Sequence, residues 1–212
     1  MVTKYYTGAG DSGDTQIGGK RILKCDVNVE AIGDIDELNS FVGLARAFMK
    51  NKDVDEILKQ IQNKLFTAGA EIGYGKGVKI ISADVKFLED TIDQYAEKTG
   101  DINYFIYPAG SQLASLLHVC RAVCRRAERS VVSLSKAASQ SSEKEKINPE
   151  LLRYLNRLSS LFFVLARFAN KEAGIKDEKW RLIAPIPFIL NESSFCIQHV
   201  LVKFVVSAVH AR

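Results

Sequence analysis

The hydrophobic positions of this chain return at helical spacing along five separate stretches. In the segment 108–138 apolar residues recur every third or fourth position, which places them on one stripe of a helix. Comparable stripes predict helices over about 34–50, 54–71, 82–99 and 149–173. Strand-like alternation is almost absent, so we expect an all-α protein built as a five-helix bundle.

Polar residues indicate where the helices should begin. Asp34, with Glu37 three residues later, has the form of a capping box, so residues 21–33 are expected to be an extended lead-in. Later caps are expected at Ser82, Ser111 and Asn148. The first cap needs only Asp34 and Glu37. The carboxylate of Asp36 is left over, and a cation elsewhere in the protein would be its natural partner.

The helix over 108–138 also carries a row of arginines. Arg121, Arg125 and Arg129 are spaced four residues apart, so they should share one face. A guanidinium offers paired donors and keeps its charge, which suits such a row to binding a polyphosphate. A solvated helix face with ion pairs would show the same spacing, and the helix alone does not separate the two interpretations.

The segment 3–20 is rich in glycine and threonine and shows no helical periodicity. It contains G-x-G-x-x-G at Gly8, Gly10 and Gly13, but it lacks the buried strand and the helix that a dinucleotide fold requires around this motif. The amides and hydroxyls of such a loop can instead wrap an anion. An N-terminal turn without a function is the alternative.

Two further positions are candidates for contacting a ligand. Phe105, in the loop 101–110, could pack in the core or face a flat ligand, and the core is the commoner place for an isolated aromatic side chain. Asn156 stands in mid-helix among apolar residues. A buried amide there must find partners, so it is either a structural hydrogen bonder or a ligand contact.

Composition narrows the class of protein. With 212 residues, 47% of them hydrophobic, the chain can form one globular domain with a substantial core. Its net charge of +4 is spread over interspersed charges, unlike the segregated basic excess of a dedicated nucleic-acid binder. Cys120 and Cys124 lie one helical turn apart on an apolar stripe, so we expect buried thiols rather than a disulfide. The N-terminus resembles no signal or transit peptide, so a cytoplasmic location is expected.

The C-terminal region gives a weaker signal. Residues 195–209 are apolar but too short for a membrane span, and Lys203 interrupts them. They could form an edge strand, a packed helix or an interface element. Elsewhere, none of the three histidines follows a glutamate by three residues, which excludes the inward Glu-x-x-His pairs of a di-iron bundle.

Four segments together resemble the ATP:cob(I)alamin adenosyltransferases of the widespread trimeric type. Residues 7–15 are similar to the family's loop T-x-x-G-D-x-G-x-T, and residues 35–40 read I-D-E-L-N-S. Residues 108–129 contain L-H-x-x-R-x-x-x-R-R-A-E-R, and residues 156–159 read N-R-L-S. The resemblance covers about residues 3–180 in the right order. P-A-G-S stands at 108–111 where the family usually shows P-G-G, and the chain beyond 180 exceeds the usual end.

The resemblance implies a fold, a reaction and an assembly. A five-helix bundle with an N-terminal ATP-binding loop would span 1–180 and form a homotrimer with active sites between neighbouring subunits. Residues 181–212 would be an extension of unknown role. The reaction would move the 5′-deoxyadenosyl group of ATP, with Mg²⁺, to the cobalt of cob(I)alamin and release triphosphate. A reductase and a cobalamin-dependent mutase or dehydratase would be partners, while no nucleic acid and no membrane span are expected.

The resemblance also implies roles for individual residues. The residues that would wrap the ATP phosphates are Thr7, Gly8, Gly10, Asp11, Gly13, Thr15 and Lys20. Arg125 would hold the polyphosphate and stabilise the leaving group, and Glu128, Arg129 and Asn156 would complete the nucleotide pocket. Mg²⁺ would bridge the phosphates without a side-chain ligand that can be named.

Two of the implied roles concern the corrinoid. Asp36 would pair with Arg121 across the subunit boundary, which would give the spare carboxylate its cation. Phe105 would press on the lower face of the corrin and exclude the axial base or water, which would make the cobalt easier to reduce. Because cob(I)alamin is itself a strong nucleophile, the absence of a Ser/His/Asp or Cys/His set agrees with this chemistry.

Rival interpretations come from other classes of protein. An ATP- and corrinoid-binding sensor or chaperone without turnover would need the same residues. A bundle that binds nucleic acid or an acidic partner would use the arginine face, and a salt-dependent gel shift would favour it. A purely structural trimer would leave Asn156 and the loop without a purpose.

Overall fold

The computed structural model describes residues 5–74, 77–139 and 147–181. Its helices are α1 (Val27–Ala47), α2 (Lys52–Tyr74), α3 (Ser82–Thr99), α4 (Gln112–Ser139) and α5 (Pro149–Glu172), and its strands are β1 (Asp14–Ile17) and β2 (Lys20–Leu23). All seven elements belong to one compact unit, Met1–Lys179. The second unit, Trp180–Arg212, is described only at Trp180 and Arg181, so the apolar stretch 195–209 lies outside the described residues. The predicted all-α five-helix fold is confirmed.

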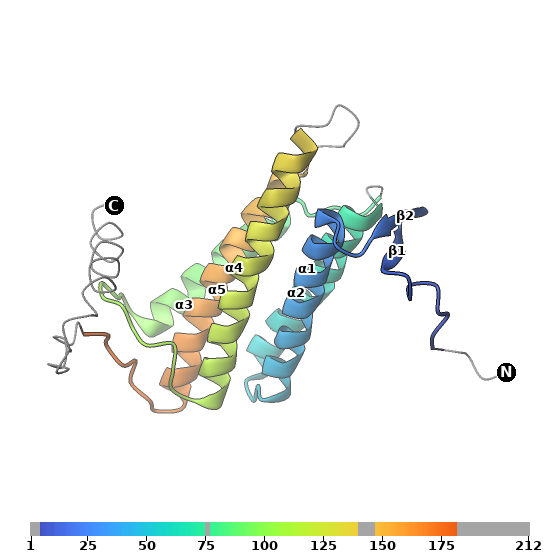
Figure 1. Ribbon diagram of the computed structural model, residues 1–212. Coiled ribbons are helices and arrows are strands. Elements are labelled where there is room, and N and C mark those ends of the chain that lie inside the picture. The colour runs from blue at the N-terminus through green and yellow to red at the C-terminus, as the bar shows by residue number, and fades with distance from the viewer. Residues whose placement is uncertain (1–4, 75–76, 140–146, 182–212) are drawn as a thin grey trace, which may run out of the picture. The chain divides into compact units, whose positions relative to one another are not determined.

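The helices pack in a defined order of neighbours. α2 packs on α1, α1 on α4, α4 on α5 and α5 on α3, so α4 lies between α1 and α5 (Figure 1). The apolar stripe of α4 is fully buried at Leu117, Cys120 and Cys124. Both cysteines are free thiols, as predicted, and burial raises the pKa of Cys120 to about 12. The arginine-bearing helix is therefore fixed on two sides.

The first helix begins earlier than its sequence pattern predicts. The N-cap of α1 is Asp26, whose carboxylate accepts a hydrogen bond of 2.8 Å from the Asn28 amide. The predicted capping box at Asp34 and Glu37 is wrong, because both residues lie inside the helix and bind Arg126 of α4. Val27 and Ala31, which lie in the predicted lead-in, are four positions apart and so share one face of this helix.

A β-hairpin occupies part of the predicted N-terminal loop. β1 pairs antiparallel with β2, with Asp14 opposite Leu23 and Ile17 opposite Lys20. Gly18 and Gly19 form the turn with φ of 58° and 81°, the left-handed conformations that a tight hairpin turn requires. The strands are short and largely exposed, so they carry no buried alternating pattern. A hairpin was therefore not predicted.

Two of the three other predicted helix caps are found in the structure. The Ser111 hydroxyl accepts from the Ala114 amide at 3.1 Å, and the Asn148 side chain accepts from the Glu150 amide at 3.0 Å, so both caps are confirmed. Ser82 is wrong as a cap. It is the first helical residue of α3, whose N-cap is Ile81.

Candidate functional site

Four of the predicted nucleotide-binding residues lie around one open cavity. This cavity has a volume of about 440 Å³ and lies between α4 and α5. Its lining consists of Arg125, Glu128, Arg129, Val132, Ser133 and Asn156. The α-helical repeat brings the two arginines and the glutamate to the same side of α4, and α5 supplies Asn156. The cavity combines two guanidiniums with one carboxylate and one amide.

The two exposed arginines have no carboxylate partner within the described residues. Arg129 Nη1 donates to the backbone carbonyl of Arg125 at 3.0 Å, which holds it alongside the helix. The alternative of a helix face laced with ion pairs therefore fits Arg126, which binds Asp34 and Glu37, but not Arg125 or Arg129. Their charge is available for an anion.

Asn156 is exposed, so the prediction of a buried amide is wrong. Its Nδ2 donates to Glu128 Oε1 at 3.0 Å, and its Oδ1 accepts from Arg157 Nη1 at 2.8 Å. Apolar residues surround it in sequence because α5 packs on both α3 and α4, yet this position faces outward between them. The amide faces the cavity, where a ligand can reach it.

Arg121 differs from the other two arginines of the predicted row. It is half-buried, and its Nε atom is fully buried without a hydrogen-bond partner in the described chain. Burial, and secondly the positive charge of Arg125, lower the pKa of Arg121. A buried donor without an acceptor is costly, so Arg121 is a guanidinium that would gain from a carboxylate brought by another molecule.

Asp36 is exposed on α1, and its carboxylate has no cation partner among residues 5–74, 77–139 and 147–181. Its backbone carbonyl accepts from the Ser40 hydroxyl at 3.1 Å, an ordinary helical contact. No hydrogen bond or ion pair joins Asp36 to Arg121 within the described part of one chain. In the part of the chain that the structure describes, both predicted partners are thus left without a counter-charge.

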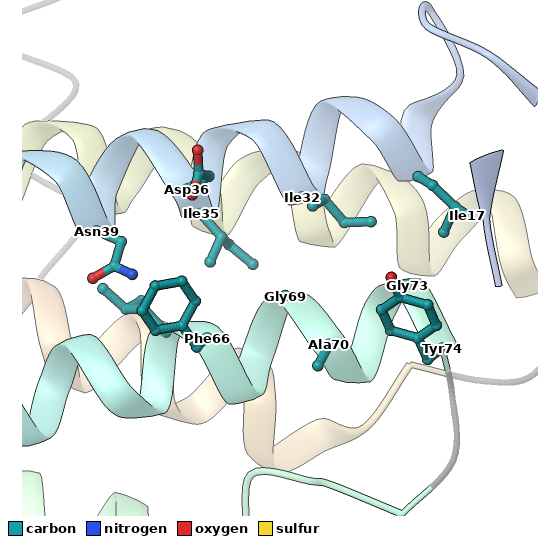
Figure 2. A pocket seen from close by; sticks show the side chains of 11 residues that line it. Ile17, Ile32, Ile35, Asp36, Asn39, Phe66, Gly69, Ala70, Gly73 and Tyr74 are labelled. Carbon is teal, nitrogen blue, oxygen red and sulfur yellow. The ribbon is translucent and has the colours of Figure 1, made fainter. Parts of the chain in front are cut away.

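Asp36 also lines a cavity that the sequence analysis missed. This cavity, of about 310 Å³, lies mainly between α1 and α2, and most of its lining is apolar. Figure 2 shows Ile35 pointing toward α2 and Asp36 pointing away from it, with Phe66 on the facing helix. The available signal was the small residues Gly69, Ala70 and Gly73 of α2, which leave room beside the α1 side chains.

The N-terminal loop is tied to the hairpin by charged side chains. Arg21 binds the carboxylate of Asp14 at 2.5–2.7 Å and also donates to the Ala9 carbonyl at 2.7 Å. The hydrogen bond from Arg21 is the largest cause that lowers the pKa of Asp14 to about 2. Lys24 donates to the Gly10 carbonyl at 2.8 Å. The loop is thereby shaped before any ligand arrives.

The predicted loop residues lie on this exposed segment. Thr7 accepts from the Ala9 amide at 3.3 Å, and Gly8 and Gly13 have φ of 70° and 85°. Asp11 is exposed, Thr15 lies in β1, and Lys20 begins β2 beside the turn. The motif leads into a hairpin rather than a helix, which excludes the dinucleotide-fold interpretation.

Phe105 lies on an anchored loop rather than in the core. Its side chain is 66% exposed in the single chain. The loop is held by a hydrogen bond of 2.9 Å from the Tyr107 amide to the Glu178 carbonyl, and by a bridge between Ile106 and Lys179. The expectation that an isolated aromatic belongs to the core is wrong at this position. A flat partner can reach the exposed part of the ring.

Neither a membrane-spanning helix nor a metal-binding cluster occurs among the described residues. In the described part of the chain, no helix combines the length and apolar character needed to cross a bilayer. The same residues contain no cluster of three or more histidine, cysteine or carboxylate side chains arranged to hold a metal ion.

Comparisons with known proteins agree with this arrangement. The sequence model of the family described as Cobalamin adenosyltransferase matches residues 5–169. The chain is 42% identical to a Corrinoid adenosyltransferase of Bacillus subtilis (strain 168), covering 84% of this chain and 92% of that protein. It is 34% identical to the Corrinoid adenosyltransferase MMAB of Homo sapiens, covering 84% and 73%.

Solved structures show the same similarity. A variant of the PduO-type ATP:corrinoid adenosyltransferase from Lactobacillus reuteri, complexed with cobalamin and ATP, superposes with a TM-score of 0.77 at 36% identity. The alignment covers 84% of this chain and 97% of that one. A second variant of that enzyme, complexed with ATP, gives a TM-score of 0.75 at 37% identity, covering 83% and 99%. The chain therefore belongs to the cobalamin adenosyltransferase family.

Proposed function

We propose that this protein is a corrinoid adenosyltransferase, which moves the 5′-deoxyadenosyl group of ATP to the cobalt of cob(I)alamin and forms adenosylcobalamin. Relatives covering most of the chain are named for this activity. The single observation that carries the proposal is the cavity in which Arg125, Arg129, Glu128 and Asn156 come together. It offers positive charge for phosphates and polar groups for the rest of a nucleotide.

In this reaction the protein must align the two substrates and neutralise charge, and it need not provide a nucleophile. Cob(I)alamin supplies an electron pair that attacks the C5′ carbon of ATP, so a cobalt–carbon bond forms while the C5′–oxygen bond breaks. Triphosphate leaves with both bonding electrons and therefore gains negative charge. Arg125 and Arg129 lie where that charge can be neutralised, and positioned cations lower the barrier of such a step.

The N-terminal loop is proposed to close over the phosphates. Its carbonyl oxygens at Ala9 and Gly10 accept from Arg21 and Lys24, so these acceptors are satisfied within the chain. The Asp11 and Gly13 amides donate to loop carbonyls, and a phosphate would compete for them. Lys20, exposed beside the turn, would add a positive charge, and Mg²⁺ would bridge the phosphate oxygens. The loop is fastened to the α1–α2 side, since Gly18 lies against the Gly73 carbonyl.

A homotrimer would bring the two sides of this site together. Within one chain the hairpin contacts α2, whereas the arginine cavity lies between α4 and α5. Asp36 on α1 and Arg121 on α4 each lack a partner in the described chain. An ion pair between Asp36 of one subunit and Arg121 of the next would satisfy both, beside the apolar cavity that a corrin could contact.

Phe105 is proposed to contact the lower face of the corrin and exclude the axial ligand. Its exposure and its anchored loop support this role. The Lactobacillus reuteri structures carry substitutions of a phenylalanine or of an arginine, which are spaced along that chain as Phe105 and Arg125 are along this one. The spacing supports assigning a role in the reaction to both residues.

Partners and location follow from the proposed reaction. A reductase must supply the electron that generates cob(I)alamin, and a cobalamin-dependent mutase or dehydratase would use the product. A strongly reduced cobalt centre is best kept in a reducing compartment, and Cys120 and Cys124 are free thiols, so we propose a cytoplasmic location.

A spectroscopic assay tests the function. Purified protein is mixed with chemically reduced cobalamin, ATP and Mg²⁺, the visible spectrum is followed for the alkylcobalamin product, and triphosphate is assayed. Equimolar formation of adenosylcobalamin and triphosphate is expected. Binding of both ligands without either product would contradict the proposal and favour a sensor or chaperone.

A further inference from the structure

The Asn156 side chain is held from two sides by groups of opposite hydrogen-bonding character. Its Nδ2 lies 3.0 Å from Glu128 Oε1, and its Oδ1 lies 2.8 Å from Arg157 Nη1. A carboxylate only accepts and a guanidinium only donates. A flipped amide would set acceptor against acceptor and donor against donor. Glu128 and Arg157 therefore fix one of the two orientations of this amide.

Arg157 is itself fixed from a third helix. Its Nε donates to Glu89 Oε1 of α3 at 2.9 Å, and both side chains are partly buried where α3 packs on α5. Arg157 does not line the nucleotide cavity, whereas Asn156 does. Any effect of Arg157 on a ligand in that cavity must therefore pass through the amide that it orients.

The fixed amide selects the kind of group that it can bind. It keeps one N–H and one oxygen lone pair for the cavity, and the Glu128 carboxylate beside it keeps further acceptor sites. A phosphate would be repelled by Glu128 and attracted to Arg125 and Arg129 of the same cavity. In a nucleotide the group joined directly to the phosphates is the ribose. Its neighbouring hydroxyls each donate and accept, and a carboxylate is a common acceptor for them.

We propose that Arg157, held by Glu89, is a positioning residue that orients Asn156 so that Asn156 and Glu128 bind the ribose hydroxyls of the nucleotide. The inference rests on the proposed function for the identity of that nucleotide as ATP. It predicts that discrimination between ATP and its deoxy analogues depends on a residue outside the cavity.

The test compares ATP with 2′-deoxy-ATP and 3′-deoxy-ATP. Dissociation constants are measured by calorimetry, and kcat and KM by the spectroscopic assay, for the wild type, Arg157→Met and Arg157→Lys. Arg153→Met is the matched control, since Arg153 lies on the same helix and pairs at 3.0 Å with Glu150. Thermal unfolding of each variant is measured in parallel.

The wild type and Arg153→Met should bind ATP more tightly than at least one deoxy analogue. Arg157→Met should reduce the ratio of the two dissociation constants, deoxy analogue over ATP, at least about fivefold. The reduction should come mainly from weaker ATP binding, and the KM for the corrinoid should be unchanged. Arg157→Lys keeps a donor for the amide oxygen and should retain part of the ratio. A selective effect of this kind would not follow from a loss of stability alone.

Other outcomes overturn the inference. The inference is wrong if the wild type binds all three nucleotides equally. It is also wrong if Arg157→Met leaves the ratio of dissociation constants unchanged, even when its unfolding temperature falls. The dissociation constants are measured without a corrinoid. A wild type that shows the binding ratios but no turnover would therefore contradict the proposed function and leave this inference standing on its own data.

Discussion

At the scale of single residues, Arg125 carries the charge on which the proposed reaction depends most. Its guanidinium is exposed in the cavity between α4 and α5 that is proposed to bind the nucleotide, and it has no carboxylate partner within the described chain. Arg125→Ala should lower kcat about 10²–10³-fold, because the leaving triphosphate loses a positioned cation. Gel filtration should show an unchanged assembly, with Arg153→Ala as the control. A variant that keeps most of the wild-type kcat would contradict this role.

Phe105 should matter only for one oxidation state of the substrate. Phe105→Ala should slow the reaction when it starts from cob(II)alamin and a reductant, because the axial ligand is no longer excluded. With chemically prepared cob(I)alamin the rate should change little. Phe48→Ala removes another exposed phenylalanine and should affect neither assay. Equal rates for wild type and Phe105→Ala from cob(II)alamin would refute the assignment.

His118 should give the fold a pH dependence. It is buried with both ring nitrogens unpartnered in the described chain, and burial, followed by the charge of Arg121, lowers its pKa to about 4 from 6.5. The unfolded chain therefore binds a proton between pH 6.5 and 4 that the folded chain does not. Stability should fall as the pH falls through this window, by about 3 kcal/mol in total.

Urea unfolding at several pH values measures that contribution. The free energy of unfolding should decrease between pH 6.5 and 4 in the wild type, and His118→Leu should make this decrease smaller. An identical slope in both proteins would show that other groups cause it. The Asp14 carboxylate, with a pKa of about 2, should remain ionised throughout the window.

Single residues were predictable where spacing alone decides their position. Arg125 and Arg129 lie one turn apart on one helix, so they had to share a face. Burial was less predictable. Asn156 has apolar neighbours in sequence but faces outward, and Phe105 is an isolated aromatic that remains exposed. Both outcomes depend on which helices pack together, and local sequence does not give that information.

At the scale of elements, Asp34 links α1 to α4. Its carboxylate accepts from the Ser130 hydroxyl at 2.5 Å and from Arg126 Nε at 3.3 Å. Asp34→Ala should lower the free energy of unfolding by about 1–2 kcal/mol, because two partly buried donors lose their acceptor. Asp90→Ala breaks only an exposed pair with Lys86 and should lower the free energy of unfolding less than Asp34→Ala does, because solvent screens exposed ion pairs.

Urea unfolding measures both changes, and equal effects of the two variants would contradict the claim that Asp34 joins the helices. The same residue shows why the start of α1 was mispredicted. An aspartate followed by a glutamate three residues later satisfies the capping pattern and equally the needs of a helix–helix contact. Only the partner on α4 separates the two, and Arg126 lies 92 positions away from Asp34 along the sequence.

The hairpin shows a second limit at this scale. β1 and β2 have four residues each and pack only lightly on the helices, so burial imposes no clear alternation on their sequence. The glycine pair at the turn was the available signal for a hairpin, but residues 3–20 were predicted to be a loop throughout. Helices α2 to α5, in contrast, have long buried stripes and were predicted within a few residues of their ends.

At the scale of the whole molecule, Asp36 and Arg121 lead to a test of assembly, because neither has a counter-charge among the described residues. Asp36→Asn should weaken corrinoid binding or the proposed trimer, because Arg121 loses its proposed partner. The double variant Asp36→Arg with Arg121→Asp should regain part of the loss. Analytical ultracentrifugation and the KM for the corrinoid measure the two effects. The pairing would be contradicted if the double variant bound the corrinoid and assembled no better than Asp36→Arg or Arg121→Asp alone.

The cavity between α1 and α2 also belongs to this scale. Its lining comes from the hairpin and two helices, and it exists because small residues of α2 face the isoleucines of α1. Sequence patterns identify the residues of each helix that are apolar, but they do not show where two packed faces leave a space. The activity was predicted from the family resemblance, whereas this cavity was found only in the structure.

The most direct measurement is a crystal structure of the assembled protein with ATP and Mg²⁺ bound. We predict that the triphosphate lies within hydrogen-bonding distance of Arg125 and of the loop 7–15, with Arg121 and Asp36 paired between neighbouring subunits. ATP bound away from both Arg125 and the loop, or a site completed within a single chain, would contradict it.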